Sequence, residues 1–189
     1  MTNPDFSSLP ADLPAPQDDG AARHLDGMVL PDVSLEATDG TRVSLSRLRG
    51  RTVVYAYPRT GEPGQPTLVP DWDAIPGARG CTPQACDFRD HHAALQARGV
   101  AQVHGLSTQT SAYQREVAAR LHLPFTLIAD PHRAFTQAAR LPTFTAGGHT
   151  LLKRLTLIID DGRVRQVFYP VFPPDRGAEQ VIAWLDANA

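Results

Sequence analysis

The chain has 189 residues, of which 42% are hydrophobic and 20% are charged, and its formal net charge is −2. This length is sufficient for one domain with a hydrophobic core. The near-neutral charge provides no basic surface for nucleic acid or for a membrane. No stretch reaches the roughly 18 consecutive apolar residues of a transmembrane helix. We therefore expect neither nucleic acid nor a membrane as a partner.

The first twenty residues, MTNPDFSSLPADLPAPQDDG, are rich in proline, aspartate and alanine. We expect an extended or disordered tail over residues 1–24, followed by one domain over residues 25–189. The tail has neither the basic start nor the apolar core of a secretory signal. A cytoplasmic location is therefore the default expectation.

The first elements of the domain are β-strands. Two alternating segments, residues 33–37 and 41–45, flank the turn sequence Thr38-Asp39-Gly40 and predict a β-hairpin. The apolar run at residues 52–57, TVVYAY, is typical of a buried strand. Residues 58–80 follow with many prolines and glycines and no periodicity. A loop of this length inside a compact domain is usually functional or disordered.

A helix is predicted over residues 82–98, with Thr82 as its N-cap, Pro83 in its first turn and Gly99 after its end. The proline in Leu141-Pro142-Thr143-Phe144 is interpreted as a turn residue. Further strands are predicted at residues 103–106, 125–128, 155–159 and 164–169, and further helices at 111–121, 133–140 and 180–187. Strands that alternate with helices favour an α/β fold with parallel βαβ units, to which the late hairpin adds antiparallel strands.

Cys81 and Cys86 are the only two cysteines. Cys81 comes just before the predicted helix, where unpaired N–H groups and the helix dipole favour a thiolate. In an intact helix the two Cα atoms would lie about 8.6 Å apart, beyond the roughly 7 Å limit of a disulfide. The pair could therefore react in sequence only if the first turn unwinds. The alternative is that both are ordinary buried residues with inert thiols.

The segment GCTPQACDFRD, residues 80–90, resembles the peroxidatic segment of the peroxiredoxins, closest to the peroxiredoxin Q (bacterioferritin comigratory protein) type. The segments at residues 105–107, 123–130 and 154–160 fall in the order of that family. The similarity covers roughly residues 28–189. It implies a thioredoxin-like α/β fold, with a central mixed β-sheet flanked by helices and an N-terminal β-hairpin, and it implies thiol peroxidase activity.

The resemblance also implies roles for individual residues. Cys81 would be the peroxidatic thiolate and Cys86 the resolving thiol, and the two would form an intramolecular disulfide. Arg154 would stabilise the thiolate and polarise the peroxide, while Pro58 would shield the thiolate. The substrate would be hydrogen peroxide or an organic hydroperoxide, and a thioredoxin-like dithiol would be the reductant. No metal or organic cofactor would be needed, and the protein would be a monomer or a homodimer.

The sequence departs from the family pattern at three places. Pro58 lies 23 residues before Cys81, so about sixteen residues are inserted in the loop 58–80. Ala78 stands where the family usually has a threonine or serine that binds the peroxide; Thr60 could supply that hydroxyl or could be an ordinary loop residue. Gln84 replaces a glutamate. The alternative function is therefore a redox-sensing or thiol–disulfide exchange protein on the same fold with weak peroxidase turnover.

Overall fold

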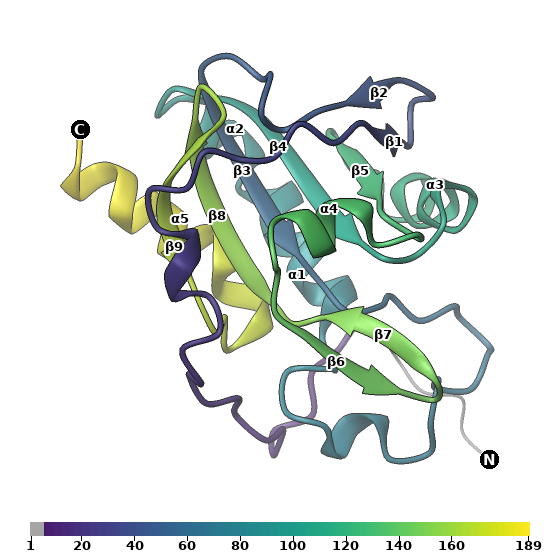
Figure 1. Ribbon diagram of the computed structural model, residues 1–189. Helices are drawn as coiled ribbons and strands as arrows, with labels where there is room; N and C mark the ends of the chain where they lie inside the picture. The colour runs from purple at the N-terminus through teal and green to yellow at the C-terminus, as the bar shows by residue number, and fades with distance from the viewer. Residues whose placement is uncertain (1–5) are drawn as a thin grey trace.

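A seven-stranded mixed β-sheet forms the centre of the computed structural model, which describes residues 6–189 (Figure 1). The strand order is β2-β1-β5-β4-β3-β8-β9, with β3, β4 and β5 parallel and the other neighbours antiparallel. The strands are β1 (Leu35–Ala37), β2 (Arg42–Val43), β3 (Arg51–Ala56), β4 (Val100–Ser107), β5 (Thr126–Ala129), β8 (Leu155–Asp160) and β9 (Arg163–Phe168). The expected mixed α/β sheet with an N-terminal hairpin is confirmed.

Helices cover both faces of the sheet, which explains why successive residues of the central strands β3 and β8 are almost all buried. Along β3, Val53 and Tyr55 face a core shared with α1, α2, α3 and α5, whereas Val54 and Ala56 face a second core shared with α4. The helices are α1 (Cys81–Asp90), α2 (His92–Gln96), α3 (Ser111–Arg120), α4 (Ala134–Ala138) and α5 (Gly177–Ala187), and short 3-10 helices lie at Arg23–Leu25, Trp72–Ala74 and Pro174–Arg176.

The helix that carries both cysteines differs from the prediction at its start and near its middle. It begins at Cys81 after Gly80, whose φ of 104° is left-handed, so the predicted N-cap at Thr82 was wrong. Glycine adopts this conformation without a steric penalty. The helix then breaks at His91, between α1 and α2. The His91 ring nitrogen Nδ1 lies 2.9 Å from the Asp87 carbonyl oxygen, an acceptor that the helical ladder also uses.

The structure contains a second, two-stranded sheet that we did not predict. It comprises β6 (Thr143–Ala146) and β7 (His149–Leu152), joined by Gly147 and Gly148, which both have positive φ. Figure 1 shows this hairpin beside the loop 58–80, at one end of the main sheet. Trp72 and Ala78 of the loop pack with Ala146 and Leu151 of the hairpin in a small third core. The inserted loop is therefore fixed by a hydrophobic cluster of its own.

The N-terminal segment lies on the domain as an extended chain. The part that the structure describes, residues 6–24, contains turns and the start of the 3-10 helix at Arg23–Leu25. Ala22 and Leu25 are buried in the core that includes α4. Residues 1–5, the remainder of the predicted tail, lie outside the described residues.

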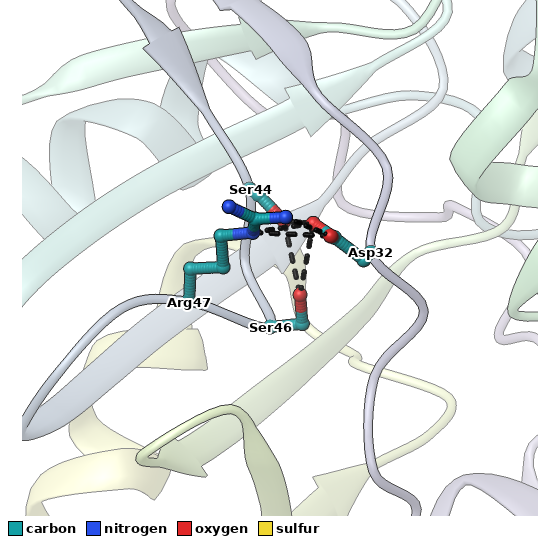
Figure 2. A network of polar contacts seen from close by, with 4 residues as sticks. All are labelled: Asp32, Ser44, Ser46 and Arg47. Atoms are coloured by element: carbon teal, nitrogen blue, oxygen red, sulfur yellow. Dashed lines mark hydrogen bonds and ion pairs between the residues drawn. The ribbon is translucent and has the colours of Figure 1, made fainter.

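A polar network connects the segment before β1 with the turn that follows β2. Figure 2 shows the Asp32 carboxylate accepting hydrogen bonds from Ser44, Ser46 and Arg47. The Arg47 and Asp32 side chains are 75% and 52% exposed. Exposed ion pairs of this kind contribute little to stability, so the network mainly defines the path of the chain around the edge hairpin.

Candidate active site

Cys81 lies at the point where the inserted loop becomes helix α1. Its side chain is 3% exposed. The sulfur Sγ lies 3.3 Å from Nη2 of Arg154 and 3.6 Å from the carbonyl oxygen of Ala78. The thiol is thus buried at a helix N-terminus, in direct contact with a guanidinium group.

Arg154 reaches this position through the register of the sheet. In the antiparallel pairing of β3 and β8, Ala56 is opposite Leu155. Arg154, which precedes β8, therefore lies at the end of the sheet where β3 leads into Pro58. The side chain is 2% exposed, and its Nη2 lies 3.1–3.4 Å from the carbonyl oxygens of residues 77–79.

The guanidinium of Arg154 has neutral acceptors around it. Besides the three carbonyl oxygens, Nη1 donates to the side-chain oxygen Oε1 of Gln84. Of its hydrogen-bond partners within residues 6–189, only Cys81 can become negatively charged. A buried cation without an anionic partner is costly. Ionisation of Cys81 would therefore provide the counter-charge that this arginine lacks.

Gln84 lies on the same face of α1 as Cys81, three residues further along. It is fully buried, so its oxygen still orients Arg154 although the side chain carries no charge. In the described part of the chain its Nε2 group has no hydrogen-bond partner. The Gln84 amide therefore orients Arg154 without supplying a negative charge.

The structure places Pro58 at the end of β3 and Thr60 two residues beyond it. Tyr57 makes the last backbone hydrogen bond to β4, and the Pro58 carbonyl then accepts from Ser107 Oγ at 3.1 Å. The Thr60 hydroxyl donates to Gln109 at 3.0 Å. Thr60 thus anchors the start of the loop, and its expected contact with a peroxide stays a prediction.

A cavity of about 270 Å³ opens onto Cys81. Most of its wall belongs to the inserted loop, and Thr82, Tyr113 and Phe6 complete it. The hydroxyl of Thr82 is buried and has no hydrogen-bond partner within residues 6–189. From the sequence we interpreted Thr82 as a helix cap and did not identify its hydroxyl as a site group. The position of Thr82 directly after Cys81 was the one sequence signal that pointed to a place in the site.

Cys86 lies on the same unbroken helix as Cys81, and both are free thiols. It is half-buried, and this burial raises the pKa of its thiol, an effect that the nearby Arg89 opposes. The intact helix between the two sulfurs agrees with the geometric argument that a disulfide requires unwinding.

Asp87, the residue after Cys86, attaches α1 to the C-terminal helix. Its side chain is 3% exposed, its oxygen Oδ2 accepts a 2.7 Å hydrogen bond from the backbone N–H of Ala178, and its Oδ1 lies 3.0 Å from His91 Nδ1. Burial raises the pKa of Asp87 to about 6. The protonation state of Asp87, and with it the contact between α1 and α5, therefore changes with pH near 6.

The described residues, 6–189, contain no group of three or more His, Cys, Asp or Glu side chains arranged to hold a metal ion. None of the helices in this range is long and apolar enough to cross a membrane.

A buried cysteine at a helix N-terminus, in contact with an arginine on a mixed α/β sheet, is the arrangement of a thiol-based redox protein. The family model described as Redoxin matches residues 25–182. A chloroplastic peroxiredoxin Q from Gentiana triflora is 29% identical over 187 residues, which are 95% of this chain and 77% of the relative. Another, from Sedum lineare, is 31% identical over 163 residues, 85% of this chain and 77% of the relative.

A crystal structure of the peroxidoxin BcpB from Mycobacterium tuberculosis is 25% identical and superimposes with a TM-score of 0.68, covering 87% of this chain and 97% of that protein. The chain therefore belongs to the redoxin family and, within it, to the peroxiredoxins of the Q type. The thioredoxin-like fold and the thiol-dependent peroxidase activity expected from the sequence are confirmed. The cytoplasmic location stays a prediction, since both plant relatives are named as chloroplastic.

Protonation of Asp87 should be visible in the stability of the protein. The folded state holds this proton up to a pH of about 6, whereas the ordinary value is 3.8. The free energy of unfolding should therefore fall as the pH rises from about 4 to about 6, by roughly 3 kcal/mol for a shift of two units. Denaturant unfolding of Asp87→Asn should show most of this fall removed. Asp90→Asn, on the exposed side of the same helix, is the control. The assignment is wrong if Asp87→Asn keeps the wild-type fall.

Proposed function

We propose that the peroxidase reaction uses Cys81 as the peroxidatic thiolate, Cys86 as the resolving thiol and Arg154 as the group that stabilises developing negative charge. The observation that carries this proposal is the 3.3 Å contact between Arg154 Nη2 and Cys81 Sγ. Within residues 6–189, Cys81 is the one ionisable hydrogen-bond partner of this buried arginine. Cys81 also lines the cavity in which a peroxide could bind.

In the first step the Cys81 thiolate attacks one oxygen of the peroxide. A sulfur–oxygen bond forms and the oxygen–oxygen bond breaks. The leaving oxygen takes up a proton and departs as water or alcohol, and Cys81 becomes a sulfenic acid. Arg154 and the N–H groups at the start of α1 would stabilise the charge that moves onto the leaving oxygen. Pro58 would keep bulk water from the thiolate.

In the second step the first turn of α1 unwinds and the Cys86 sulfur attacks the Cys81 sulfenic acid. A sulfur–sulfur bond forms, the sulfur–oxygen bond breaks and water leaves. A thioredoxin-like dithiol then reduces the disulfide by exchange through a mixed disulfide. Burial raises the pKa of Cys86, which agrees with a resolving thiol that reacts only after the first turn has opened.

The cavity supports organic hydroperoxides as substrates alongside hydrogen peroxide. Its volume of about 270 Å³ is several times the roughly 30 Å³ that a water molecule occupies. Leu68, Trp72 and Phe6 provide apolar surface, whereas Arg59 and Glu62 provide charge. The alternative function, redox sensing or thiol exchange with weak peroxidase turnover, would draw on the loss of a hydroxyl at Ala78 and of a charge at Gln84.

The mass of the oxidised protein tests the reaction directly. Addition of one equivalent of peroxide to the reduced wild type should remove two hydrogens, because a disulfide forms. Cys86→Ser should gain one oxygen instead, and Cys81→Ser should react no faster than a free thiol. An unchanged thiol count in the wild type excludes the mechanism. A disulfide that forms but does not turn over with a dithiol favours the sensing alternative.

Removal of the guanidinium should slow the first step. We expect Arg154→Ala to lower the rate of Cys81 oxidation by about 10²-fold or more, the typical effect of a lost oxyanion donor. Stopped-flow fluorescence with hydrogen peroxide measures this rate. Arg165→Ala, on the exposed side of β9, is the matched control and should react as the wild type. An undiminished rate in Arg154→Ala would remove this residue from the mechanism.

Two hydroxyl groups compete for the role of peroxide ligand. In the sequence Thr60 was one candidate, with an ordinary loop role as the alternative, and its hydroxyl donates to Gln109. Thr82 lines the cavity, and its buried hydroxyl has no hydrogen-bond partner within residues 6–189. We expect Thr82→Val to reduce the oxidation rate about tenfold, equivalent to ~1.4 kcal/mol for one lost hydrogen bond. Thr60→Val, measured beside it, should have a smaller effect. The reverse order would assign the peroxide to Thr60.

A further inference from the structure

The N-terminal strap, which we define as residues 6–19, crosses the peroxide site and contacts the backbone that must move during the reaction. The Phe6 ring lies 5.0 Å from the Arg79 guanidinium and directly against Gly61. The Ser8 carbonyl accepts a 3.5 Å hydrogen bond from Arg79. The strap therefore contacts the loop immediately before Cys81.

The strap also contacts the two glycines that lead into α1. A Cβ atom built on Gly80 would lie 2.3 Å from Pro174 Cγ and 2.9 Å from Leu9 Cδ2. At Gly77 the corresponding distance to Pro16 is 3.6 Å. The backbone that precedes Cys81 thus contacts both the strap and the 3-10 helix at Pro174–Arg176.

The far end of the strap is attached elsewhere. Asp19 accepts hydrogen bonds from Lys153 at 2.6 Å and from the Tyr169 hydroxyl at 2.8 Å. The hydrogen bond from Lys153 is the main reason that the pKa of Asp19 is lowered. Beyond it, Ala22 and Leu25 are buried in the core. None of these partners belongs to α1, so this end can stay in place when α1 unwinds.

We propose that the N-terminal strap is a redox-dependent clamp, which docks on the reduced site and is released from residues 77–80 when the Cys81–Cys86 disulfide forms. The proposal rests on the disulfide of the proposed function. Unwinding of the first turn displaces Gly80 and Arg79, and the contacts of Phe6 and Leu9 depend on their present positions.

The coupling between the strap and the helix acts in both directions. If disulfide formation weakens strap docking, strap docking must disfavour unwinding by the same free energy. The docked strap therefore keeps Cys81 in the peroxide-reactive geometry and delays resolution. The longer-lived sulfenic acid can meet a second peroxide, which transfers an oxygen, leaves as water or alcohol and produces a sulfinic acid. The strap thus sets the balance between resolution and over-oxidation.

Hydrogen exchange of the full-length wild type tests the release. Amides of residues 6–18 should exchange faster in the disulfide form than in the reduced form, while those of β3 and β4 stay unchanged. Cys86→Ser after one equivalent of peroxide is the control, because its sulfenic acid leaves α1 wound and the strap docked. Equal exchange of the strap in a protein whose mass shows the disulfide would overturn the clamp. Absence of the disulfide itself would instead contradict the proposed function.

A charge introduced under the strap tests the reciprocal effect. Leu9→Asp should raise the rate constant of disulfide formation by about fivefold or more, the lower end of typical coupling between sites. It should also lower the sulfinic acid fraction at high peroxide concentration. Ala11→Asp is the matched control, because it places the same charge at an exposed position of the strap. The clamp is contradicted if the two variants resolve the sulfenic acid at the same rate.

Discussion

The site depends on one buried positive charge. The Arg154 guanidinium is almost inaccessible to water and is surrounded by neutral oxygen atoms. Desolvation of a cation costs several kcal/mol unless an anion compensates it. Among the hydrogen-bond partners of Arg154 within residues 6–189, Cys81 is the one side chain that can carry a negative charge. The sheet register, the carbonyl groups at residues 77–79 and the Gln84 amide all converge on this group. The packing at this end of the molecule can therefore be understood as a scaffold that holds one arginine against one sulfur.

The inserted loop is part of the same scaffold. A stretch of this length could close its ends at little entropic cost and remain loose. Here Trp72 and Ala78 pack instead on the β6–β7 hairpin and form a small apolar core with it. Because Ala78 lies three residues before Cys81, this core fixes the loop close to the site. The three carbonyl groups that accept from Arg154 come from the last part of this loop. The hairpin therefore supports the arginine indirectly, although it contributes no side chain to that contact.

Local chemistry made part of this structure predictable. The apolar run of β3, the glycine after the cysteine-bearing helical segment and the pair of cysteines each have a signal within a few neighbouring residues. Arg154 has no such signal, because its role follows from the pairing of β3 with β8 across about a hundred residues; only the family resemblance indicated it. The bond of Thr60 to Gln109 and the docking of residues 6–19 are likewise long-range contacts without periodicity. The β6–β7 hairpin was a different kind of omission, since Gly147-Gly148 between two β-prone segments was a readable turn signal.

The amide of Gln84 has a consequence for the behaviour of the site in acid. A carboxylate at this position would be protonated on acidification. It would then lose most of its electrostatic attraction to the Arg154 guanidinium. An amide does not titrate, and neither do the three backbone carbonyls beside it. The hydrogen bonds that orient Arg154 are therefore independent of pH over the range in which a carboxylate would titrate.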